Sequence, residues 1–290
     1  MGRWQIDLAC AEQSPVQCLL AVSVLIAAGL CLVTGSFAGV AWLWLLPVSF
    51  VGAFVVLVGL AFGFLWLMCK LVDQSKPQEQ DSKFYRGLMH LYVDAIITVA
   101  RINVKTSGLE QTPKSGRFLL VSNHIDNIDP AFLLTYFRKS QLAFISKREV
   151  QNFFLVGELM HKILCQPINR ENDREALKTI LKCIQIIKED KASIAVFPEG
   201  YIQPDKKLHH FRPGVFKIAT KTKVPIVVCT LQGTMHVLRN FLHLKPSTVD
   251  LHLLKVIYPE EYENLTTVEL SDRIYRLMAE DLGPDRVAQE

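Results

Sequence analysis

The feature that most restricts this chain is a long run without any ionisable side chain. Residues 13–69 contain no Asp, Glu, Lys, Arg or His. One straight α-helix over this run would be about 85 Å long, whereas the hydrocarbon core of a bilayer is about 30 Å thick. Thr34-Gly35-Ser36 is a sequence typical of a turn. The run therefore predicts a hairpin of two apolar helices, at about residues 16–33 and 40–69, the second bent at Pro47.

Two other interpretations of this run are a helical hairpin buried in a protein core and a cleaved signal peptide. A signal peptide has a basic start and one short apolar region, whereas here Arg3 is offset by Asp7 and Glu12 and a second apolar segment follows. The flank after the run is basic and contains Lys70, Lys76, Lys83, Arg86 and Arg101. By the positive-inside rule we expect this flank in the cytoplasm and residues 1–70 in the cell membrane, either across it or within one leaflet.

The rest of the chain changes in character twice. Residues 71–83 are polar and contain a proline, which predicts a linker, and residues 84–104 have the spacing of an amphipathic helix. From residue 117 onward, short β-rich runs alternate with longer helical ones, which predicts an α/β domain over residues 84–290 with a mostly parallel sheet flanked by helices. The expected strands are 117–123, 141–146, 165–169, 192–197, 224–231 and 249–258. The expected helices include 129–139, 170–190 and 267–282.

Charge and cysteine content favour some partners over others. The seven cysteines have no CxxC or His/Cys metal spacing, so we expect reduced thiols and no metal site. Residues 206–223 hold six basic side chains and no acid: Lys206, Lys207, Arg212, Lys217, Lys221 and Lys223. This basic run is either a solvated face or a surface that attracts anionic lipid or a phosphorylated substrate. Nucleic acid is not expected as a partner, because no binding module is recognisable.

His124 and Asp129 stand five residues apart at the predicted junction of a strand and a helix. Asp129-Pro130 is a typical helix start, so Asp129 can fold back toward His124 at the carboxyl edge of the sheet, where ligands bind in open α/β folds. The pair then predicts a general base, although Asp129 could instead only cap its helix. No G-x-S-x-G motif accompanies the pair, so we expect the base to act on a substrate hydroxyl.

Four ordered blocks resemble the glycerolipid acyltransferases, specifically the 1-acyl-glycerol-3-phosphate (lysophosphatidate) acyltransferase family. They are NHIDNID (123–129), KREV to PINR (147–170), VFPEG with FRPGVFKIA (196–219) and VPIVV (224–228), within about residues 85–260. The resemblance implies transfer of a fatty acyl group from acyl-CoA or acyl-carrier protein to the sn-2 hydroxyl of 1-acyl-glycerol-3-phosphate, with phosphatidate as product. It implies no metal or redox cofactor.

The same resemblance implies roles for individual residues. His124 would take the proton of the acceptor hydroxyl, and Asp129 would orient the His124 side chain. The substrate-binding residues implied are Asn123, Lys147, Arg170, Glu199, Gly200, Arg212 and Pro225. Arg170 and Lys147 match basic positions assigned to phosphate recognition, a task that suits the planar fork of arginine.

One departure from the family pattern bears on the acceptor. Many members read Phe-Pro-Glu-Gly-Thr-Arg-Ser, whereas Tyr201 and Ile202 replace the Thr and the Arg here. Either phosphate binding shifts to Lys147, Arg170 and Arg212, or the acceptor is another lysolipid. A hydrolase and a non-catalytic lipid-binding or scaffold protein of the same fold are the further alternatives.

Overall fold

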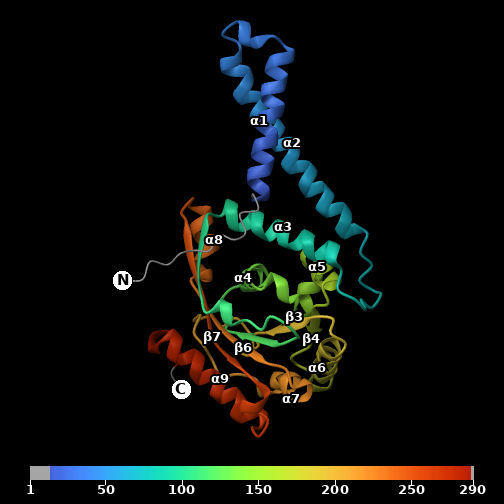
Figure 1. The fold of residues 1–290 in the computed structure, drawn as a ribbon, viewed down its shortest axis with the longest axis vertical. Coiled ribbons are helices and arrows are strands. Elements are labelled where there is room, and N and C mark those ends of the chain that lie inside the picture. The colour runs from blue at the N-terminus through green and yellow to red at the C-terminus, as the bar shows by residue number, and fades with distance from the viewer. Residues whose placement is uncertain (1–13, 289–290) are drawn as a thin grey trace. The chain divides into compact units, whose positions relative to one another are not determined.

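The computed structural model describes residues 14–288, which form two compact units (Figure 1). The first unit ends at Leu71 and also holds Leu91–Val99; the second contains Val72–His90 and the chain from Ala100 onward. The first thirteen residues of the expected anchor, among them Arg3, Asp7 and Glu12, lie outside the described residues.

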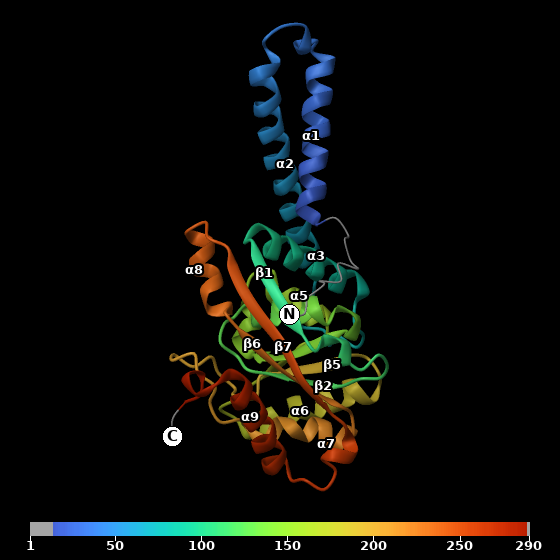
Figure 2. The ribbon, with the colours of Figure 1, turned by 60° about the vertical axis from the view of Figure 1, so that its left-hand side comes forward.

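The first unit contains the expected hairpin of apolar helices, α1 (Pro15–Val33) and α2 (Trp42–Lys70), which run side by side (Figure 2). Gly35, at a φ of 66°, lies in the turn between them, and α2 continues through Pro47. The mean hydropathies are 2.6 and 2.5, and 19 and 29 residues correspond to about 28 and 43 Å. Both helices are therefore long and apolar enough to cross a membrane, which indicates membrane association.

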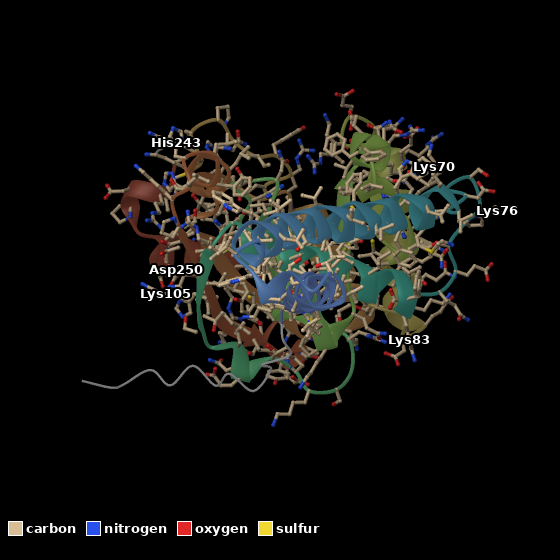
Figure 3. All side chains as sticks on the ribbon, turned by 90° about the horizontal axis from the view of Figure 1, so that it is seen from above. Lys70, Lys76, Lys83, Lys105, His243 and Asp250 are labelled. Atoms are coloured by element: carbon tan, nitrogen blue, oxygen red, sulfur yellow. The ribbon has the colours of Figure 1, made fainter. Side chains whose placement is uncertain are left out.

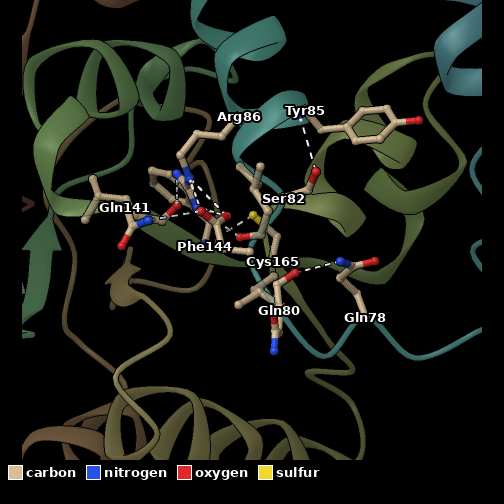
Figure 4. Close-up of polar contacts among 12 residues, drawn as sticks. Gln78, Gln80, Ser82, Tyr85, Arg86, Gln141, Phe144 and Cys165 are labelled. Carbon is tan, nitrogen blue, oxygen red and sulfur yellow. Dashed lines mark hydrogen bonds and ion pairs between the residues drawn. The ribbon is translucent and has the colours of Figure 1, made fainter.

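The segment that follows the hairpin is packed onto the second unit rather than loose (Figure 4). The Asp81 carboxylate accepts hydrogen bonds from Arg86 at 2.7 and 2.8 Å, and both side chains are buried. Arg86 also donates to the carbonyl of Leu142 at 2.9 Å, and the Ser82 amide donates to that of Lys162 at 3.0 Å. The end of the expected linker is thus fixed by a buried ion pair and by backbone contacts.

The expected helix over residues 84–104 ends earlier than predicted, and its last three residues belong to a strand. Helix α3 spans Lys83–Val99, Arg101 has a positive φ of 51°, and β1 begins at Ile102. Strand β1 (Ile102–Ser107) pairs in parallel with β7 (Ser247–Ile257), which lies far along the chain. The helical spacing of apolar residues continues into β1. Pairing with β7, which is distant in the sequence, makes these residues adopt an extended strand instead.

The second unit is built on a seven-stranded sheet in the order β1-β7-β6-β2-β5-β3-β4, in which only the β6–β7 pair is antiparallel. This confirms the mostly parallel α/β fold. The remaining strands are β2 (Leu119–Ser122), β3 (Leu142–Lys147), β4 (Gln166–Ile168), β5 (Ser193–Val196) and β6 (Ile226–Gln232). The remaining helices are α4 (Asp129–Tyr136), α5 (Val156–Lys162), α6 (Asp173–Lys188), α7 (Lys217–Thr222), α8 (Val237–Leu242) and α9 (Thr267–Leu282).

Helices cover both faces of the sheet, with α4 and α5 on one side and α6, α7 and α9 on the other (Figure 1). Helices α6 and α9 bury their apolar faces against the strands, as Ile184 and Ile274 illustrate. Alternate residues of β2 reach opposite faces, so all four of its side chains are buried. The parallel strands β2, β3, β4 and β5 therefore end at one common edge of a rigid core, and the segments that leave this edge form the candidate site.

Candidate active site

His124 and Asp129 meet at this edge, as their spacing predicts. His124 follows β2, and Asp129 is the first residue of α4. The Nδ1 atom of His124 lies 2.8 Å from Oδ2 of Asp129, which also accepts from the backbone amides of Ile125 and Asp126 at 2.8 and 2.9 Å. Asp129 is fully buried, whereas 15% of the His124 side chain is exposed. The carboxylate thus organises the loop and fixes the histidine ring.

The geometry sets which nitrogen of His124 is available. The Asp129 carboxylate accepts a hydrogen bond from the Nδ1–H group of His124, so in this tautomer Nε2 carries the lone pair. Within the described residues, Nε2 makes no hydrogen bond, and the ring stacks on Phe197 with centroids 4.1 Å apart. The imidazole is therefore oriented on one nitrogen and open on the other, as a general base requires.

Glu199 lies beside His124 but uses both carboxylate oxygens within the protein. Its Oε1 accepts from the backbone amide of His124 at 2.9 Å, and its Oε2 accepts from that of His209 at 3.1 Å. The side chain is only 3% exposed, and this burial raises the pKa of Glu199 to about 7. Glu199 therefore ties the histidine loop to the loop after β5. In this structure both carboxylate oxygens make positioning contacts, and the contact of Glu199 with a substrate stays a prediction.

Asn123 has a similar internal function. Its side-chain amide donates to the carbonyl of Leu231 at 2.9 Å, and its oxygen accepts from the amide of Leu231 at 2.7 Å. Asn123 is 2% exposed, so this paired contact pins the end of β2 to the end of β6. Both polar atoms of the side chain are thus engaged within the protein, and a contact of Asn123 with a substrate stays a prediction.

Pro225 does not line the site that the sequence predicts for it. Its carbonyl accepts from the amide of Leu119 at 2.9 Å, and β6 then runs parallel to β2. Pro225 therefore lies at the amino edge of the sheet, and at about 3.3 Å per residue the strands separate it from His124 by roughly 15–20 Å. Strand β6, which follows Pro225, reaches the site at its carboxyl end, where Leu231 contacts Asn123.

Arg170 and Arg212 come together around a residue that departs from the family pattern. The guanidinium carbons of Arg170 and Arg212 lie 5.2 and 4.9 Å from the ring centroid of Tyr201. Arg212 also donates to the Tyr201 hydroxyl at 2.8 Å. Within residues 14–288 neither guanidinium forms an ion pair with a carboxylate, and burial lowers the pKa of Arg170 from its ordinary value. Tyr201 thus holds two cations close together, as anion recognition needs.

Gly200 allows this arrangement. It has a φ of +85°, and a Cβ at this position would lie 3.0 Å from Nε of Arg212. A side chain here would strain the backbone and displace the guanidinium. Lys147 is exposed, and its Nζ lies 3.1 Å from Oε1 of Glu149, whose charge also acts on Arg170.

A cavity of about 500 Å³ opens beside the two arginines. Phe197, on which His124 stacks, forms part of its wall. Its apolar lining comes from the sheet, α6 and the turn before α7, and includes Ile145, Ile168, Leu177, Ile180, Val196 and Phe211. The arginine cluster and the apolar lining thus share one cavity, and Phe197 is the residue that connects this cavity to His124.

Sequence reasoning missed two contributors, Phe197 and His209. Phe197 belongs to the Phe-Pro-Glu-Gly block, and aromatic character directly after a buried strand was an available signal. The amide of His209 carries no sequence signal. Among the described residues, no group of three or more His, Cys, Asp or Glu could hold a metal ion.

Comparisons with known proteins found similarity to acyltransferases. An acyltransferase family model matches residues 103–232. A probable 1-acyl-sn-glycerol-3-phosphate acyltransferase of Mycoplasma pneumoniae is 28% identical, over 69% of this chain and 77% of the relative. The 1-acyl-sn-glycerol-3-phosphate acyltransferase of Limnanthes douglasii is 30% identical, and the match spans half of each chain. The crystal structure of the 1-acyl-sn-glycerophosphate acyltransferase PlsC from Thermotoga maritima shares the fold, with a TM-score of 0.55 and 20% identity over 76% of this chain and 86% of that chain. The chain is therefore similar to acyltransferases in sequence, over residues 103–232, and to PlsC in fold.

Proposed function

We propose that this enzyme transfers a fatty acyl group from a thioester donor, acyl-CoA or acyl-carrier protein, to the sn-2 hydroxyl of 1-acyl-sn-glycerol-3-phosphate. The products are phosphatidate and the free thiol of the carrier. The observation that carries the proposal is the 2.8 Å contact between Nδ1 of His124 and Oδ2 of Asp129, which leaves Nε2 of His124 open. Relatives named for this reaction support the choice of acceptor.

The chemistry follows from the orientation of His124. Nε2 accepts the proton of the acceptor hydroxyl as the oxygen attacks the thioester carbonyl, while Asp129 stabilises the imidazolium that forms. The tetrahedral intermediate collapses, the carbon–sulfur bond breaks, and the imidazolium returns the proton to the thiolate. Each turnover thus restores the base without a covalent enzyme intermediate or a cofactor.

The arginine cluster supports an acceptor that carries a phosphate monoester. Arg170 and Arg212 are two like charges held side by side by Tyr201, and a dianion between them offsets their repulsion. Each guanidinium can bond two phosphate oxygens. This pair takes over the task of the arginine that Ile202 replaces. The apolar cavity beside it suits the acyl chain of a lysolipid.

The apolar hairpin suits lipid substrates, because a membrane-associated enzyme need not extract its acceptor into water. We place the α/β unit on the cytoplasmic side, where soluble acyl donors are found. The basic flank after α2, with Lys70, Lys76 and Lys83, supports this orientation.

Purified full-length protein in detergent tests the proposal. The assay follows acceptor-dependent release of free thiol, with each donor, and formation of phosphatidate. We expect His124→Ala to lower the rates of thiol release and of phosphatidate formation by about 10²–10⁴-fold. His252→Ala is the matched control, because His252 also contacts an aspartate at 2.7 Å, but this pair joins β7 to Asp281 of α9.

Each other outcome selects an alternative. Retention of most activity in His124→Ala would refute the proposed base. Release only with a different lysolipid would assign another acceptor, and release without any acceptor would indicate a hydrolase. A complete lack of turnover in wild type would favour the lipid-binding scaffold.

A further inference from the structure

A short segment of the α/β unit presents large apolar side chains to solvent. It comprises residues 235–245, which form the turn before α8, helix α8 and the turn after it. The exposed fractions of its apolar side chains are 42% for Met235, 67% for Leu238, 42% for Phe241, 70% for Leu242 and 77% for Leu244. A cluster of this kind on a water-facing surface normally marks an interaction site.

The exposure is built into the fold, because the segment is held firmly on its inner side. Val237 is 4% exposed and faces the domain. Asn240 donates to the hydroxyl of Ser247 at 3.1 Å, and the amide of Lys245 donates to the carbonyl of Asn240 at 2.8 Å. The side chain of Arg101 also donates to the carbonyl of Leu244. Leu238, Leu242 and Leu244 thus project from an anchored support.

The charges on the segment are all of one sign. His236, Arg239, His243 and Lys245 lie between the apolar residues, and no acid occurs from residue 206 to residue 249. Asp250, the next acid, stands beside Lys105 in the register of β7 and β1, on the same side of the unit as His243 (Figure 3). The segment therefore combines apolar side chains with uncompensated basic ones.

This combination fits an anionic membrane better than a protein partner. Buried cores of protein interfaces are depleted in lysine and other charged residues, whereas membrane-surface helices mix basic and large apolar side chains. The chain connectivity agrees, because Arg101, which contacts the segment, follows two residues after Val99, the last residue of α3. The chain thus returns from the membrane-associated unit directly into the support of this segment.

We propose that residues 235–245 are a second membrane-contacting element, distinct from the apolar hairpin. Leu238, Leu242 and Leu244 enter the boundary between headgroups and acyl chains, while Arg239 and Lys245 contact the phosphates of anionic lipids. The α/β unit is then held on the bilayer at a defined side. This proposal is independent of acyl transfer.

Photo-crosslinking tests the proposal in the full-length protein. Benzoylphenylalanine replaces Leu242 in one sample and Leu181 in the control, because Leu181 is 55% exposed but lies on α6. Both proteins are reconstituted into vesicles of phosphatidylcholine, with or without phosphatidylglycerol, and adducts are identified by mass. We expect lipid adducts at least about tenfold more abundant at position 242 than at 181, and more abundant with phosphatidylglycerol.

A charge variant separates the two parts of the proposal. Arg239→Gln combined with Lys245→Gln should abolish the preference for phosphatidylglycerol and leave adducts with phosphatidylcholine. Equal lipid adducts at positions 242 and 181 would refute the proposal, and so would adducts to a second copy of the chain. Because the readout is an adduct and not turnover, an enzyme that fails every acyl-transfer assay would still give a valid result.

Discussion

Replacing Glu199 by glutamine tests whether a buried carboxylate holds the site together. Both oxygens of Glu199 accept backbone amides, from His124 and His209. Burial raises its pKa from the ordinary 4.5 to about 7, and the charges of Asp129 and Asp205 act in the same direction. Glutamine has nearly the same shape but cannot ionise, and its NH2 group replaces one accepting oxygen, so one of the two backbone amides loses its partner. That loss is the same at every pH, whereas the change of the stability difference with pH reports the proton.

The sign of the pH dependence follows from the two pKa values. Below pH 4.5 the carboxyl is protonated in the folded and unfolded chains, and above about pH 7 it is ionised in both. Between these limits folding takes up a proton, so the stability of wild type falls as pH rises. At about 1.4 kcal/mol per pKa unit, the loss amounts to about 3 kcal/mol. For a domain of this size, that loss lowers the melting temperature by roughly 6–12 °C.

Thermal unfolding in detergent measures this difference. As pH rises from about 4.5 to 8, we expect the melting temperature of wild type to fall by roughly 6–12 °C relative to that of Glu199→Gln. Glu263→Gln, at an exposed position, should follow wild type at every pH. A difference between wild type and Glu199→Gln that does not change with pH would refute the reasoning. Near-wild-type acyl transfer by the variant would refute the positioning role.

Three further variants test separate features of the structure. Arg86→Met should lower stability by about 3–5 kcal/mol, because it leaves the Asp81 carboxylate buried without its partner; thermal unfolding measures this. Gly233→Ala should cost about 1–3 kcal/mol or more, since φ is +87° and the new Cβ would lie 2.4 Å from the carbonyl oxygen of Thr248; a melting temperature equal to wild type would contradict the geometry. Tyr201→Phe keeps the ring but loses the hydroxyl that accepts a hydrogen bond from the Arg212 guanidinium. We therefore expect the KM for 1-acyl-glycerol-3-phosphate to rise about fivefold with kcat nearly unchanged. An unchanged KM would exclude a role of this hydroxyl in acceptor binding.

Local sequence signals determined much of the architecture. The uncharged run predicted the hairpin, because a bilayer limits the length of each apolar helix. The expected helix over residues 267–282 matches α9, since Thr266 and Glu269 form a capping box at its start. The strand, turn and helix start around His124 and Asp129 also predicted their contact. Each of these features depends on residues that are close neighbours in the chain.

Only the tertiary structure decided the features that need distant partners. Strand β1 exists because β7 pairs with it, although its sequence continued the pattern of a helix. Parallel register carries Pro225 to the edge away from the site, whereas motif order alone placed it inside. Glu199 became a positioning residue because two backbone amides from separate loops meet its oxygens. A sequence specifies which groups are available, but contacts between remote segments form only when the core packs, and those contacts fix what each group can do.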